Sequence, residues 1–443
     1  MAASLLISCA AFLSLLAILR TDRLSLGLPL AYLGSLLLIH VPGAYVHLFG
    51  HGDLVGDHEV AVGIGYTALG VVCFTAGVWL ARMQLARPVR PSAAPPPDLQ
   101  RRFRLFCLLG GWLFVYGLSP LSRIPSLGAA IDKGGAIWML GALIGLREAF
   151  ASRDPKRVAL WAAALMVYPA LTLVLGGFLS YGSAALIVAC SVLAITARSY
   201  GGSIVGIMIA ALVGLNFFVN YFEHRESIRA QVWGGASFER KLDSVYEMFT
   251  DFHIVSRNNV DDFKALDVRL NQNFFIGLAS ERIKQHEASY LDGGSLWDGV
   301  LAVIPRALWP DKPIRAGSGR LVEDATGLRL SQTTSWGVGN VLEFYINFGV
   351  PGLIVGFLFL GWLLGRLDFL AAVAERRGDF EATIGLFLPA VALIQPGGSV
   401  VEMVGGAAAA LVASFAWKRA WRIWRRSRGR SRPLGESSMA PSR

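Results

Sequence analysis

Residues 204–219 read IVGIMIAALVGLNFFV, an apolar run without a charged side chain, and a polar segment from 221 to 345 follows it. A helix that crosses a bilayer needs roughly 20 mainly apolar residues, and this run approaches that length. The whole chain is 54% hydrophobic and 16% charged, and its mean hydropathy is +0.51. These values are typical of a membrane protein and not of a soluble one.

Apolar runs of this kind recur along the chain and predict an all-α, polytopic integral membrane protein with about 11 transmembrane helices. They lie at 2–19, 24–39, 60–80, 105–118, 135–146, 158–175, 181–196, 204–219, 351–370, 382–394 and 400–417. Arg20 and Arg23 follow the first run instead of preceding it, which is the reverse of a cleaved signal peptide. We therefore expect the N-terminus outside, because lysine and arginine then collect in the cytoplasmic loops.

This topology divides the chain into four parts. Residues 1–220 hold helices one to eight, with a proline-rich cytoplasmic linker at 87–100, and residues 346–417 hold helices nine to eleven. The tail, 418–443, is basic and cytoplasmic. Residues 221–345 form one large helical loop outside the cytoplasm, in which helical periodicity is expected at 236–253 and along one longer amphipathic run at 260–290.

Charge and motifs exclude several classes of function. The net charge of +10 lies mostly in the predicted cytoplasmic loops and tail, where it orients helices, so we expect no nucleic acid partner. The four cysteines fall inside apolar runs and form no metal pattern. The chain has neither a Walker A nor an HExxH motif, and no cytoplasmic stretch is long enough for a nucleotide-sugar domain. We expect no cofactor.

Histidines gather near the start of the chain. His40, His47, His51 and His58 lie with Asp53 and Asp57 in the first predicted outside loop. Their spacing is loose and the backbone is rich in glycine, so a zinc site is disfavoured. We interpret them as loop residues at the membrane interface.

The polar segment contains a proline-framed stretch, 304–313, with the sequence IPRALWPDKP. Its prolines exclude a regular helix and predict a rigid bend that holds Arg306 and Lys312 near Trp309. Arg315 and Arg320 follow within a few residues. Cations beside an indole ring suit a ligand that joins phosphate to sugar. The alternatives are an interfacial arginine, an Asp311–Lys312 pair and ordinary aromatic-belt tryptophans.

This stretch, followed by GNVLEFYINFGVPGLIVG at 339–356, resembles the bacterial oligosaccharide repeat-unit polymerases, the Wzy-like O-antigen and exopolysaccharide polymerases. The resemblance in motif covers residues 269–365. It implies metal-independent, inverting glycosyl transfer between polyprenyl-pyrophosphate-linked oligosaccharides at the outer face of a bacterial cytoplasmic membrane. Membrane lipid, a chain-length regulator and a flippase of the same pathway are the further partners it implies.

Candidate site residues follow from the chemistry of this transfer. Arginines stabilise the charge that develops on a pyrophosphate leaving group, and a carboxylate can take the proton of the acceptor hydroxyl. The catalytic candidates are Glu343, Arg306 and Arg315. Side chains suited to sugar or phosphate complete the set, namely Arg269, His286, Trp309, Lys312, Arg320, Trp336, Asn340, Tyr345 and Asn347. Glu343 can instead cap a helix or join an ion pair, and His286 is the second candidate for the base.

Two other enzymatic or transport roles stay open at this point. An O-antigen-type ligase uses the same donor with another acceptor, although the chain matches no histidine motif that would favour it. A flippase for lipid-linked oligosaccharides is a different class; it would place functional charges within the spans. A partner protein without catalysis is a further alternative.

Overall fold

The computed structural model describes residues 1–50, 55–85, 95–118, 120–121, 124, 127–177, 180–256, 259–304, 308–309, 311–312, 318–329 and 336–429. Throughout these residues the fold is helical and contains no β-strand. The first half comprises α1 (Ala2–Asp22), α2 (Leu28–Leu38), α3 (Val41–Phe49), α4 (Asp57–Leu85), α5 (Pro97–Trp112), a π-helical turn (Leu113–Gly117), α6 (Leu127–Gly135), α7 (Ile137–Ala151), α8 (Pro155–Gly176) and α9 (Ser180–Thr196).

The second half begins with one long helix, α10 (Tyr200–Trp233). Five shorter helices of the polar segment follow, namely α11 (Phe238–Thr250), α12 (Val260–Arg269), α13 (Asn273–Lys284), α14 (Gly294–Ala302) and α15 (Ser318–Thr326). The chain then forms α16 (Asn340–Arg376), α17 (Phe380–Ala392) and α18 (Val400–Gly429).

Eight segments of the described chain are helices long and apolar enough to cross a membrane. They are Ala2–Thr21, Leu28–Phe49, Asp57–Leu85, Leu127–Ala151, Pro155–Val174, Tyr200–Trp233, Asn340–Arg376 and Val400–Arg426. Gly182–Thr196 and Phe380–Ala392 are shorter apolar helices. The predicted run at 105–118 is divided between the end of α5 and the π-helical turn. The all-helical class is confirmed, and the total of 11 spans stays a prediction.

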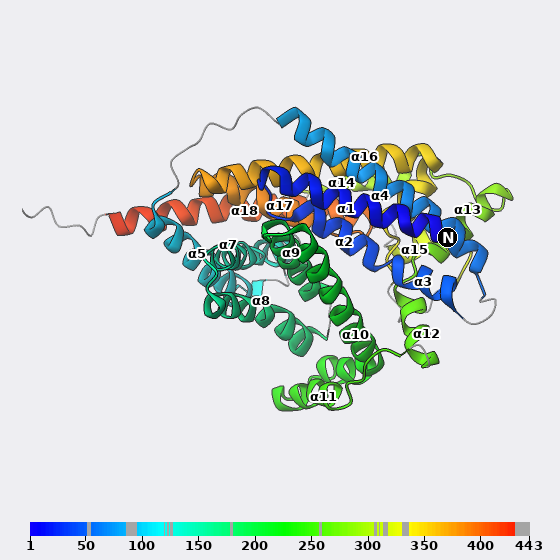
Figure 1. The fold of residues 1–443 in the computed structure, drawn as a ribbon, viewed down its shortest axis with the longest axis horizontal. Coiled ribbons are helices and arrows are strands. Elements are labelled where there is room, and N and C mark those ends of the chain that lie inside the picture. Colours follow the sequence, from blue (N-terminus) through cyan, green and yellow to red (C-terminus); the bar gives the residue numbers. More distant parts are fainter. Residues whose placement is uncertain are drawn as a thin grey trace, which may run out of the picture.

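Helices α1, α4, α16 and α18 run along the long direction of the molecule, whereas α10 leaves the bundle at a steep angle and carries α11 at its far end (Figure 1). Close glycine contacts hold the bundle together. A Cβ on Gly63 of α4 would lie 2.0 Å from the Asn273 carbonyl oxygen, and one on Gly277 of α13 would lie 2.0 Å from that of Glu59. Only glycine permits this approach of α4 to α13.

A buried ion pair joins the bundle at the end predicted to face the cytoplasm. Arg82 on α4 contacts Asp368 on α16 at 2.8 Å, and the Asp368 side chain is fully buried. The same carboxylate accepts hydrogen bonds from the amides of Leu26 and Leu28 at the start of α2. Because its oxygens have these partners, this buried charge is compensated.

The predicted amphipathic run 260–290 is not one helix; it breaks between α12 and α13. The Leu270 carbonyl accepts a hydrogen bond from the Gly43 amide, and the Gln272 amide donates to the Ile39 carbonyl. The backbone at the break therefore bonds to the junction of α2 and α3 instead of continuing the helix. Helical periodicity could not show this, because the partners lie more than two hundred residues away.

Helix α16 also contains an interruption near its start. Phe348 and Gly349 have non-helical backbone angles, with Gly349 at φ 61°. Pro351 follows and has no amide hydrogen to donate. The Ile346 carbonyl accepts a hydrogen bond from the Leu291 amide at 2.9 Å. The kink thus separates a short outer portion that carries four candidate site residues from the long apolar portion.

Candidate functional site

Arg269, at the end of α12, meets Trp336, which lies just before α16. The guanidinium carbon of Arg269 is 4.7 Å from the centre of the Trp336 ring and 5.4 Å from that of Phe222 on α10. Trp336 in turn packs edge-on against Phe275 of α13, with ring centres 5.1 Å apart. The fold therefore brings two predicted substrate-binding residues from distant parts of the polar segment into direct contact.

Two further arginines lie close to Arg269. The pKa of the Arg269 guanidinium is lowered to about 10. Burial is the largest cause, and repulsion from Arg225 and Arg229 of α10 adds to it. The Nε atoms of Arg225 and Arg269 are buried and have no hydrogen-bond partner among the described residues. A partly buried group of like charges is costly, and the neighbouring Glu226 carboxylate offsets part of this cost at Arg225. Arg225 and Arg229 are not among the site residues predicted from the sequence, although their spacing of four places them on one helix face.

Arg225 and Arg269 line the same pocket, which has a volume of about 390 Å³. This volume is within the usual range of small-molecule sites. The lining residues come from the second half of α10 and from α12, and they are Phe222, Glu223, Arg225, Glu226, Asp261, Lys264, Ala265, Val268 and Arg269. Three cations, three carboxylates and an aromatic ring line this open pocket, so a ligand here would meet groups of both charges.

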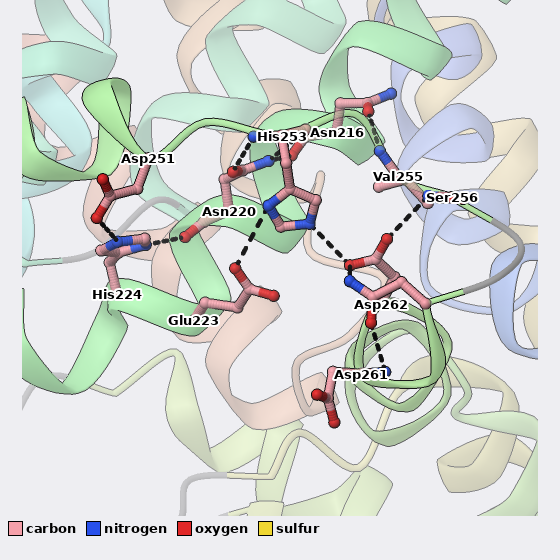
Figure 2. Close-up of polar contacts among 11 residues, drawn as sticks. Asn216, Asn220, Glu223, His224, Asp251, His253, Val255, Ser256, Asp261 and Asp262 are labelled. Carbon is pink, nitrogen blue, oxygen red and sulfur yellow. Dashed lines mark hydrogen bonds and ion pairs between the residues drawn. The ribbon is translucent and has the colours of Figure 1, made fainter.

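Beside this pocket a histidine lies between two carboxylates (Figure 2). His253 Nε2 is 2.8 Å from Asp262 Oδ1, and His253 Nδ1 is 3.7 Å from Glu223 Oε2. The hydrogen bond to Asp262 is the largest cause that raises the pKa of His253. Asn220 of α10 holds the backbone of His253 through its amide and its carbonyl. The cluster fastens α10 to the start of α12.

The same three side chains could also hold a metal ion, because their ligand atoms lie within 4.8 Å of one another. One imidazole and two carboxylates are donors suited to zinc or manganese. Asp262, however, is fully buried and already accepts hydrogen bonds from the Ser256 amide and the Asn259 side chain. We therefore interpret the cluster as an ion-paired clasp at the rim of the pocket.

Glu343, Asn340 and Asn347 are fully buried near the start of α16. Glu343 Oε2 accepts a hydrogen bond of 2.6 Å from the Val400 amide, so its carboxylate caps α18. Its Oε1 atom is buried and makes no hydrogen bond of ordinary geometry within the described chain. The capping alternative is thus realised, and the role of Glu343 as a base stays a prediction.

The two buried asparagines join helices across the bundle. Asn340 Oδ1 accepts a hydrogen bond from Tyr32 Oη at 2.7 Å. Asn347 Nδ2 donates to Ser295 Oγ of α14, also at 2.7 Å. Because these amides face protein partners, we interpret both residues as structural connections between helices.

Tyr345 is buried as well, and its contacts lie on the opposite side of α16's outer portion. Its hydroxyl is 2.9 Å from Ser280 Oγ of α13. Its ring centre is 4.6 Å from that of Tyr66 on α4. Tyr345 therefore helps to hold α13 against the bundle.

The other candidates are scattered. His286 is exposed just after α13, at φ 60°. Lys312 Nζ donates a hydrogen bond to the Ile304 carbonyl at 3.1 Å, and the backbone amide of Lys312 donates one to the Trp309 carbonyl. Arg320 is exposed and lies 3.9 Å from Asp324. Arg306 and Arg315 lie outside the described residues, so the cationic grouping predicted for 306–320 stays a prediction.

The histidines of the first predicted outside loop are placed differently from expectation. His40 is fully buried and its Nδ1 is 2.9 Å from Asn273 Oδ1. His47 lies within α3, between Asp57 and Asp267. The prediction of interfacial loop residues is wrong for these two, because the loop folds into α3 and packs under α12. His51 and Asp53 lie outside the described residues.

Over its described residues the protein is all-helical and has eight candidate membrane-spanning helices, which defines its class. A protein-family model matches residues 118–379, and the chain belongs to that family, which is described as a domain of unknown function, DUF8712. The matched region includes the pocket, the clasp and the start of α16. Comparisons with curated proteins and with solved structures gave no match.

Proposed function

We propose that this protein polymerises polyprenyl-pyrophosphate-linked oligosaccharide repeat units at the outer face of a bacterial cytoplasmic membrane. The observation that carries the proposal is the pocket in which Arg225 and Arg269 have buried Nε atoms that find no hydrogen-bond partner in the described part of the chain. The fork of arginine suits the oxygens of a pyrophosphate, and the carboxylates that line the same pocket suit sugar hydroxyls. Phe222 in the lining of the pocket adds an apolar face suited to a sugar ring or to the lipid.

In the proposed reaction the bond between the donor's anomeric carbon and its pyrophosphate oxygen breaks. The bonding electrons leave with the polyprenyl pyrophosphate, and a hydroxyl of the acceptor repeat unit attacks the opposite face of the anomeric carbon. The hydroxyl proton passes to a base or to water. Arg225 and Arg269 stabilise the leaving group electrostatically, which is often the largest contribution that a protein makes to such a transfer. This reaction needs no divalent ion or nucleotide sugar.

The proposal includes the full predicted topology of eleven spans, an N-terminus outside and a cytoplasmic C-terminus. It is supported by the charge of the terminal region, since α18 carries Lys418, Arg419, Arg422, Arg425 and Arg426 in its last turns. With this end in the cytoplasm, the opposite end of the bundle and the polar segment 221–345 face outward.

Reconstitution tests the proposal directly. The purified protein, placed in lipid vesicles with polyprenyl-pyrophosphate-linked repeat units and a metal chelator, should form a ladder of polymers. Arg225→Ala and Arg269→Ala should shorten or abolish the ladder. A ladder unchanged in both variants would contradict the assignment of the pocket, and its absence in the wild type with the correct repeat unit would contradict the polymerase.

The same experiment separates the alternatives. A ligase consumes the donor only when a different acceptor is present, and its product is a single transfer instead of a ladder. A flippase moves the lipid-linked repeat unit across the vesicle membrane without joining two units.

A further inference from the structure

Helix α11 carries two apolar surfaces, and within the described residues one is buried and the other is largely exposed. Val245 and Met248 are buried and pack against the ends of α8 and α10, and we call these two residues the buried seam. Phe238, Leu242, Tyr246 and Phe249 are exposed. At about 100° per residue these four fall within an arc of roughly 80°. We call them the α11 stripe.

The position of the α11 stripe around the helix is informative. On the same helical projection it borders one side of the buried seam, and the exposed carboxylates Asp243 and Glu247 lie beyond it, away from the seam. Both carboxylates are exposed. A helix packed sideways on a protein, with an apolar flank and a charged flank, has the distribution expected at a membrane–water boundary.

The buried seam of α11 meets the bundle where the membrane-spanning sequences end. Val245 and Met248 belong to one cluster with Leu173 and Val174 of α8 and with Tyr221, Ile228 and Val232 of α10. The candidate span of α8 ends at Val174, and the apolar run within α10 ends just before Tyr221. Tyr221 Oη donates a hydrogen bond to the Gly177 carbonyl, which fixes the two helices at this level. The C-terminal half of α11 therefore lies at the boundary set by its neighbours.

The surface next to α11 is apolar over a long distance. In the most apolar window of α10 only 11% of residues are buried, and in that of α8 only 24%. Met208, Leu212 and Val213 of α10 are among the exposed side chains. Such helices present their sides to lipid. The ring of Phe249 in the α11 stripe lies 5.9 Å, centre to centre, from that of Phe217 in the apolar run of α10. The stripe therefore adjoins this apolar helix, which favours a lipid surface as its partner.

We infer that the α11 stripe inserts into the outer lipid surface and anchors the second half of α10 there. α11 occupies the far end of the steep α10 arm (Figure 1), and the same arm carries Arg225 of the pocket. Insertion holds the pocket near the headgroups of the bilayer. This inference rests on the membrane class and on the packing of α11, and it does not depend on the glycosyl transfer.

Site-specific fluorescence can test the insertion. Tyr246→Cys and Glu247→Cys occupy neighbouring positions on the stripe and on the charged flank, and neither residue belongs to the buried seam. Each is labelled with an environment-sensitive dye in a Cys9→Ser, Cys190→Ser background, in vesicles of phosphatidylethanolamine and phosphatidylglycerol. The background without an added cysteine serves as the blank, since Cys73 and Cys107 are buried.

Lipids brominated on their acyl chains should quench the dye at position 246 strongly and the dye at position 247 weakly. Aqueous iodide should give the reverse order. Equal iodide quenching at both positions with no effect of bromolipid would overturn the inference. Protection from iodide at 246 that disappears when the protein is diluted into excess lipid would identify a second copy of the chain as the partner, and would also overturn it.

Discussion

The guanidinium carbon of Arg269 lies 4.7 Å from the centre of the Trp336 ring, and this contact joins α12 to the residues that lead into α16. It connects the pocket between α10 and α12 with the most buried part of the polar segment. Arg269 is therefore placed both to hold the fold together and to present a charge to a ligand.

Replacement of Arg269 should separate these two roles. Arg269→Lys keeps a charge but loses the planar fork, so we expect weaker binding of inorganic pyrophosphate with a small loss of stability. Arg269→Ala removes a cation–π contact of the order of 0.5–2 kcal/mol and should abolish the binding. Pyrophosphate binding by calorimetry and unfolding in mixed micelles measure the two effects. Arg240→Ala, on the exposed side of α11, is the control; an equal loss of binding there would show a non-specific charge effect.

Glu343→Gln should fold normally and retain polymerisation, because its side-chain carbonyl oxygen can still accept the hydrogen bond from the Val400 amide. Glu343→Ala removes this cap and should destabilise the protein by about 0.5–2 kcal/mol. Stability and polymer length are measured for both variants. A folded Glu343→Gln protein without polymerase activity would instead support the carboxylate as the base.

Asp368 should be far more important for stability than an exposed acidic residue. Asp368→Ala leaves Arg82 buried without its partner carboxylate, and we expect a loss of about 3–5 kcal/mol in the free energy of unfolding. Asp98→Ala, which removes an exposed pair with Arg102 on α5, should cost about 0.3–0.5 kcal/mol. Unfolding by sodium dodecyl sulfate in mixed micelles measures both. The double variant Arg82→Met, Asp368→Leu should recover much of the loss, and failure to do so would assign the residues a role beyond pairing.

The clasp at His253 should respond to pH. Its pKa is raised in the folded protein from an unfolded value near 6.5, chiefly by the hydrogen bond with Asp262. The protonated histidine therefore contributes stability that is complete below pH 6.5 and is lost as the pH rises through the folded-state pKa. Hydrogen exchange at the Ser256 amide, which donates to Asp262, should become faster with rising pH beyond the intrinsic change. His253→Gln should remove this extra dependence; its persistence would place the titrating group elsewhere.

The sequence by itself determined the helical class and most of the apolar helices. Runs such as 204–219 are so apolar that they are stable only as helices whose sides are buried in protein or in a bilayer. Local composition is therefore enough to predict these helices. It also indicated Arg269 and Trp336 as candidates, because side-chain chemistry limits what can bind phosphate and sugar.

Only the tertiary structure decided which of these candidates meet. The break between α12 and α13 depends on hydrogen bonds to Ile39 and Gly43, and the capping role of Glu343 depends on the amide of Val400. Arg225 and Arg269 line one pocket because α10 continues as one helix beyond its apolar run and packs beside α12. Each of these outcomes depends on residues remote in sequence, and the periodicity of a single segment carries no information about its distant neighbour.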